Sequence, residues 1–108
     1  MNWRKSSPPD WYLFCQALGD GRGYPKSKQD QNALGFSDED LQKLHDELIQ
    51  NHDKELTYRE KQMILNCVDG ALNYVDTDIP SLYEISKAEL KEFKENLEKR
   101  WNMHPTFL

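Results

Sequence analysis

The helix-start signals in this chain constrain its fold more than any other feature. Thr57 is followed three residues later by Glu60, and Ser86 by Glu89. In such a capping box, the hydroxyl and the carboxylate each accept a hydrogen bond from a backbone N–H that the helix leaves unpaired. Ser37 precedes a third apolar period and suits the same capping position. These signals predict helices that begin just after residues 37, 57 and 86.

The spacing of apolar residues extends the same interpretation to the whole chain. Apolar residues recur three and four positions apart after each start, as on a helix with one buried face. A fourth apolar stretch follows Pro8, which suits the first helical position, and stops at Gly19. No stretch alternates apolar and polar residues as a half-buried strand does. We therefore predict an all-α fold, a small single-domain bundle over residues 1–108 with four main helices at about 8–18, 38–52, 58–75 and 87–101.

Two connections stand out between these helices. The loop 19–36 holds four of the five glycines. A phosphate-binding loop needs a strand before it and a helix directly after it, and the sequence predicts neither. We expect a mobile connection in which Tyr24 is the residue to watch for a partner contact. The second connection, residues 77–85, predicts a turn or a short helix at 81–84.

The charge of −5 is unevenly distributed along the chain. Residues 1–37 carry five basic and three acidic side chains, whereas residues 38–78 carry four basic and eleven acidic ones. Residues 79–108 carry five of each. An acidic block of this kind disfavours binding to nucleic-acid phosphates and favours a basic protein partner.

The acidic block contains the candidate binding residues. A helix dipole stabilises carboxylates in the first turn, but Asp46 and Glu47 lie in the middle of a predicted helix and gain little from it. Asp76 lies near a helix end where a carboxylate is mildly unfavourable, which suggests selection by a partner. Tyrosines contribute disproportionately to binding energy at interfaces. We predict a partner-binding surface made of Asp46, Glu47, Asp53, Asp76, Asp78, Tyr74 and Tyr83.

The residues that could carry catalysis or bind a metal do not form a known pattern. His45 and His52 are seven residues apart, which is the wrong spacing for a zinc protease motif. Cys15 and Cys67 lie in apolar stretches, which predicts two buried, reduced and unreactive thiols. We therefore predict that the protein is not an enzyme and needs no metal or other cofactor.

Location and assembly follow from the same composition. No apolar run is long enough to span a membrane, and the first ten residues lack the apolar core of a secretory signal. We expect a cytoplasmic protein that is a monomer or a weak homodimer and binds neither membranes nor nucleic acid.

Our leading functional hypothesis is a non-catalytic acidic protein that neutralises a basic protein partner. Its most concrete form is an immunity protein, an inhibitor of a bacterial nuclease toxin. Small acidic helical immunity proteins offer an analogy in size, charge and helicity, without a shared motif. The first alternative is a structural or regulatory helical adaptor that binds a partner helix or self-associates, with an exposed apolar patch around Trp3, Trp101 and Phe107. The second is a small enzyme or metal protein whose site is dispersed in the sequence.

Overall fold

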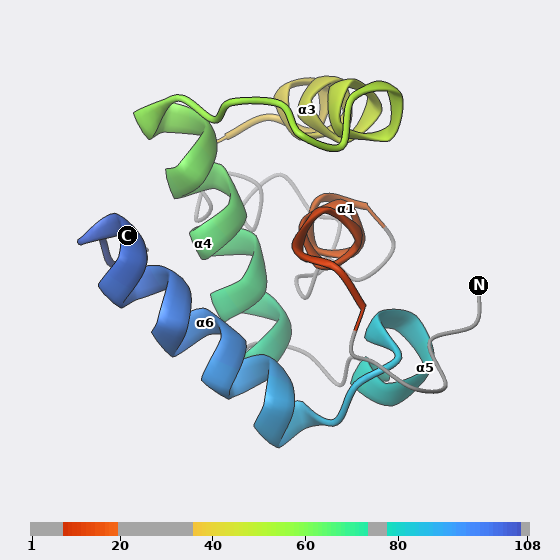
Figure 1. The fold of residues 1–108 in the computed structure, drawn as a ribbon, viewed down its shortest axis with the longest axis vertical. Helices are drawn as coiled ribbons and strands as arrows, with labels where there is room; N and C mark the ends of the chain where they lie inside the picture. The colour runs from red at the N-terminus through yellow and green to blue at the C-terminus, as the bar shows by residue number, and fades with distance from the viewer. Residues whose placement is uncertain (1–7, 20–35, 74–77, 107–108) are drawn as a thin grey trace.

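A computed structural model of the protein describes residues 8–19, 36–73 and 78–106. This part of the chain contains helices and no strand, so the predicted all-α bundle is confirmed. The described residues form four longer helices and one short helix, and Figure 1 shows their arrangement. The helices are α1 (Asp10–Leu18), α3 (Asp38–Gln50), α4 (Tyr58–Asn73), α5 (Ile79–Tyr83) and α6 (Lys87–Trp101).

The predicted caps hold the helix starts in place. The side chain of Ser37 accepts a hydrogen bond from the backbone N–H of Asp40, 3.1 Å away. Glu60 accepts from the N–H of Thr57 at 2.9 Å, while the Thr57 hydroxyl accepts from the N–H of Glu60 at 3.1 Å. Ser86 and Glu89 form the same reciprocal pair. Because each of these bonds joins residues three apart, the sequence alone was enough to predict them.

Two predicted boundaries of the main helices differ from the structure, and the short helix predicted at 81–84 spans Ile79–Tyr83. Helix α1 begins at Asp10 and not at residue 8, because Pro9 is the N-cap and Pro8 lies before it. Helix α3 ends at Gln50 and not at residue 52, because the backbone of Asn51 is extended. Helix α4 is described to Asn73, so the predicted end at residue 75 lies outside the described residues. Apart from its two ends, the loop 19–36, including Tyr24, also lies outside them.

The core lies where α4 meets α1 on one side and α6 on the other (Figure 1). Helix α1 also packs against α3 and α5, which explains why it is apolar on most of its surface. Leu18, Ile64 and Leu97 are completely buried examples from these helices. Burial of each such side chain stabilises the fold by about 1.5–3 kcal/mol. No helix in the described residues is both long and apolar enough to cross a membrane.

Gly19 ends α1 as predicted, but for a different reason from the usual left-handed turn. Its φ is −112°, a value open to other residues. A Cβ built at this position would lie 3.2 Å from the Cys15 carbonyl oxygen and 3.4 Å from the His45 ring. The closer contact is with a carbonyl oxygen of α1 itself, so glycine is favoured mainly by the limited space at the end of its own helix, and the His45 ring of α3 lies at ordinary contact distance.

Two buried amides attach the segment after α6 to α4, a feature that the sequence did not predict. The side-chain amide of Gln62 donates to the His104 carbonyl oxygen at 2.8 Å. The backbone N–H of Thr106 donates to the side-chain oxygen of Asn66 at 2.9 Å. Gln62 also donates to Asn66 at 3.0 Å. Because buried polar groups need partners, this network fixes the C-terminal segment in one position.

The burial of the two cysteines in the core can be tested by chemical labelling. Cys15 and Cys67 are both buried and form no disulfide with each other. Burial raises the pKa of the Cys15 thiol to about 11. Since the thiolate is the reactive form, we expect iodoacetamide to label the native protein at least about 100-fold more slowly than the unfolded chain. Mass spectrometry with and without guanidinium measures both rates, and rapid labelling of the native protein would contradict the prediction.

Candidate partner-binding surface

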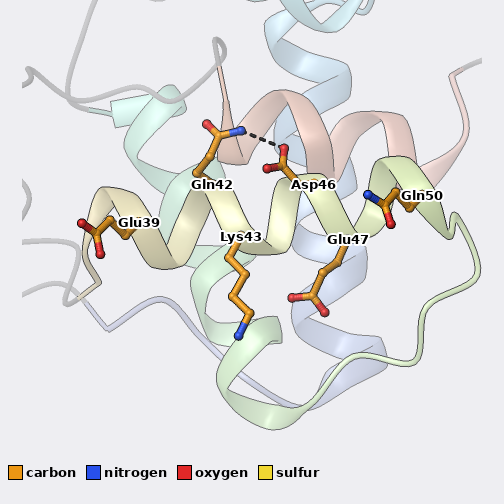
Figure 2. A pocket seen from close by; sticks show the side chains of 6 residues that line it. All are labelled: Glu39, Gln42, Lys43, Asp46, Glu47 and Gln50. Atoms are coloured by element: carbon orange, nitrogen blue, oxygen red, sulfur yellow. Dashed lines mark hydrogen bonds between the residues drawn. The ribbon is translucent and has the colours of Figure 1, made fainter.

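The candidate surface is the solvent-facing side of α3. Leu41, Leu44 and Leu48 are buried against the core, as their spacing predicted, so the opposite side of the helix faces outward. Three carboxylates and one ammonium group lie among the side chains on that side. We call this surface the α3 face, and Figure 2 shows its members: Glu39, Gln42, Lys43, Asp46, Glu47 and Gln50.

Asp46 is held in place by two neighbours on its own helix. The Gln42 side-chain amide donates to the Asp46 carboxylate at 2.9 Å, and His45 Nδ1 lies 3.1 Å from the same oxygen. The hydrogen bonds from His45 and then Gln42 hold the pKa of the Asp46 carboxyl below its usual value. Its side chain is 60% exposed. Asp46 therefore presents an oriented, ionised carboxylate to solvent.

Glu47 has an ion-pair partner beyond the end of its own helix. Lys54 Nζ lies 3.5 Å from a Glu47 oxygen and 3.3 Å from a Glu60 oxygen. The hydrogen bond to Glu60 is the main cause that raises the pKa of Lys54. One ammonium group thus links α3 to the start of α4 across the connection 51–57.

These contacts correct one premise of the sequence analysis. Asp46 and Glu47 were expected to gain no local stabilisation from their positions in the helix. That expectation is wrong, because Gln42 and His45 bind the first carboxylate and Lys54 pairs with the second. Their presence in the helix is therefore not by itself a sign of selection by a partner.

Of the remaining predicted carboxylates, Asp78 does not lie on the α3 face. Asp53 is exposed in the turn just after α3, and its backbone N–H donates to the Asn51 side chain at 3.2 Å. Asp78 is the N-cap of α5, where it accepts from the backbone N–H of Ser81 at 3.4 Å. Figure 1 shows α1 between α3 and α5. Asp78 is thus separated from the α3 face, and Asp76 lies outside the described residues.

Tyr83 is not a surface anchor, contrary to the prediction. Its side chain has 0% of its surface exposed and belongs to the hydrophobic core. Desolvation is the main cause that raises its pKa. The sequence did carry a signal for this position, because Ile79 and Tyr83 are four residues apart and both are buried in α5. The other predicted anchor, Tyr74, lies outside the described residues.

Sequence reasoning also missed an exposed apolar residue beside the α3 face. Ile49 adjoins the buried stripe of Leu41, Leu44 and Leu48, yet 49% of its surface is exposed. It follows Leu48 by one residue, which turns it about 100° around the helix and away from the core. Tyr58, at the start of α4, is 72% exposed. Exposure of this kind depends on which other helices pack nearby, so the periodicity of α3 did not reveal it.

The described residues contain only part of the apolar patch and of the residues named for the alternative functions. Trp101 is half-buried, with its ring centroid 5.7 Å from that of Phe14, while Trp3 and Phe107 lie outside the described ranges. His52 stacks on Trp11 with centroids 3.6 Å apart. Within residues 8–19, 36–73 and 78–106, no three His, Cys, Asp or Glu side chains are grouped so that they could bind a metal ion.

Comparison of the chain with protein-family models, curated proteins and solved structures found no match. The functional proposal therefore rests on the residues of this chain.

Proposed function

We propose that the protein is a non-catalytic acidic binding protein that neutralises a basic protein partner. Its most concrete form is an immunity protein that inhibits a bacterial nuclease toxin in the cytoplasm. The observation that carries the proposal is the α3 face, where Glu39, Asp46 and Glu47 accompany a single lysine on one solvent-facing surface. These three carboxylates belong to the acidic block of residues 38–78, whose eleven acidic and four basic side chains give a net charge of −7 and favour a basic partner.

The chemistry of nucleases explains why such a surface would inhibit one. A nuclease binds phosphates through lysine and arginine side chains, so its substrate channel has a positive potential. Carboxylates placed over that channel exclude the nucleic acid without any reaction. Charges of opposite sign also speed the encounter of the two proteins. Asp46 suits this role, because it is oriented before any partner arrives.

The salt dependence of inhibition tests this mechanism. We expect the chain to inhibit a purified basic nuclease domain from at least one bacterial toxin in a nucleic-acid cleavage assay. Raising the salt from about 50 mM to about 500 mM should slow association at least about tenfold, because salt screens the exposed charges. Stopped-flow measurements at the two salt concentrations give the rates.

The dissociation rate serves as the control for a general effect of salt on the two proteins. The dissociation rate of the same complex should change much less than the association rate, because steering acts mainly on the encounter. If a panel of basic toxin nucleases remains uninhibited, the immunity role is wrong. If inhibition occurs but association does not depend on salt, the charge-steering mechanism is wrong.

A further inference from the structure

The α3 face has two edges with different charge. Figure 2 shows the Lys43 and Glu47 side chains pointing to one side of α3 and the Gln42 and Asp46 side chains to the other. On the first edge, Lys43 lies near Glu47, whose carboxylate is already paired with Lys54. That edge is close to neutral, and a cationic partner would meet two ammonium groups there.

The second edge keeps its negative charge. Asp46 accepts hydrogen bonds there from Gln42 and His45 and is not paired with a lysine or arginine of the described residues. Glu39 lies on the face one heptad before Asp46 and makes no ion pair with another residue in the described ranges. Positions seven apart share one side of a helix. The two carboxylates therefore define an acidic line along this edge.

An apolar side chain borders this line. Ile49 is three residues after Asp46, and residues three apart on a helix have Cβ atoms about 5–6 Å from each other. Ile49 and Tyr58 are the exposed large hydrophobic residues of the described chain. A single exposed isoleucine is common on protein surfaces and has no meaning by itself. Ile49, however, lies beside an ionised carboxylate that is already oriented, and the two together form an apolar and charged surface that a partner could contact.

We propose that the edge formed by Glu39, Gln42, Asp46 and Ile49 binds an amphipathic cationic element of the partner. An apolar side chain of that element packs on Ile49, and flanking lysines or arginines pair with Asp46 and Glu39. The inference rests on the proposed function and adds the chemical character of the contact. A second copy of this chain does not fit, because a two-fold contact would bring like-charged carboxylates together.

The energy of such a contact should concentrate at Ile49. One edge of a single helix offers little area, and a few well-packed residues usually carry most of the binding energy of an interface. The exposed carboxylates around it mainly orient the partner and speed its arrival. Removal of the Ile49 side chain should therefore weaken binding more than removal of one exposed carboxylate beside it.

The test uses two synthetic peptides of equal positive charge. One is a helical peptide of about 14 residues that has lysines around two leucines four positions apart, a spacing that places both leucines on one face. The other is an oligolysine. We expect fluorescence anisotropy at low salt to show that the amphipathic peptide binds at least about tenfold more tightly than the oligolysine. Equal binding of the two peptides, or no binding of the first, overturns the inference.

Substitutions at the two exposed apolar residues locate the contact. Ile49→Gln should weaken binding of the amphipathic peptide about tenfold or more, whereas Tyr58→Gln should change it less than about twofold. Ile49→Met should retain binding, which shows that apolar contact and not local structure is responsible. Thermal unfolding of each variant checks the fold. Wild-type affinity in Ile49→Gln overturns the inference.

The failure of this inference can be distinguished from failure of the proposed function. If reversing the charges of Glu39 and Asp46 abolishes inhibition of the nuclease while Ile49→Gln binds both nuclease and peptide normally, the proposed function stands and the apolar contact is wrong. If inhibition occurs and neither change affects it, the α3 face is not the binding surface, so this inference fails while the inhibitory role stands.

Discussion

Replacing Tyr83 with alanine is expected to lower the free energy of unfolding by about 3–5 kcal/mol, the usual cost of removing a buried aromatic ring. The ring is completely enclosed where α5 packs against α1 and α6, so its loss leaves a cavity. A domain of this size has a total stability of about 5–15 kcal/mol. The melting temperature should fall by roughly 10–20 °C, which differential scanning calorimetry measures.

Tyr58→Ala is the matched control for this substitution. The same side chain is removed, but from a position that is 72% exposed. Its effect on the free energy of unfolding should stay within about 0.5 kcal/mol. The comparison also decides between the two roles considered for Tyr83. Equal melting temperatures in the two variants would contradict a core role and restore Tyr83 as a candidate anchor for a partner.

Reversing the charge of Glu39 and Asp46 together is expected to weaken inhibition of a basic nuclease domain by about 100-fold. The double variant Glu39→Lys, Asp46→Lys replaces attraction with repulsion at two exposed positions, and each tenfold loss corresponds to about 1.4 kcal/mol. Glu47 is left unchanged because its ion pair with Lys54 holds the connection 51–57. Titration of nuclease activity against inhibitor concentration gives the affinity.

The control for this variant has the same net charge. Glu92 and Glu95 are exposed on α6, which lies across α4 from α3 in Figure 1. Changing both to lysine should weaken inhibition less than about fivefold, because charges farther than a Debye length of about 8 Å from the contact are screened at physiological salt. If the two double variants behave alike, binding responds to overall charge and the α3 face has no special role.

The helices themselves were predictable because their signals are local. A capping hydroxyl or carboxylate reaches a backbone N–H only three residues away, so Ser37, Thr57 and Ser86 marked three helix starts correctly. The spacing of Leu41, Leu44 and Leu48 likewise identified the buried side of α3. The boundaries that differed, at Pro9 and Asn51, depend on the backbone conformation of single residues.

The composition of the binding surface was less predictable, because it depends on contacts between residues of different helices and connections. Lys54 meets both Glu47 and Glu60 only because the connection 51–57 places the start of α4 close to α3. Asp78 was grouped with Asp46 on charge alone, yet α1 lies between their helices.

The sequence by itself determined that this chain is helical, where most of its helices begin, and that residues 38–78 are acidic. Hydrogen bonding within one turn and side-chain charge are properties of short segments, and they need no tertiary structure. Only the tertiary structure decided that Tyr83 is buried and Ile49 exposed. Burial is set by the helices that pack around a residue, so the spacing of residues within one helix gives only part of that information.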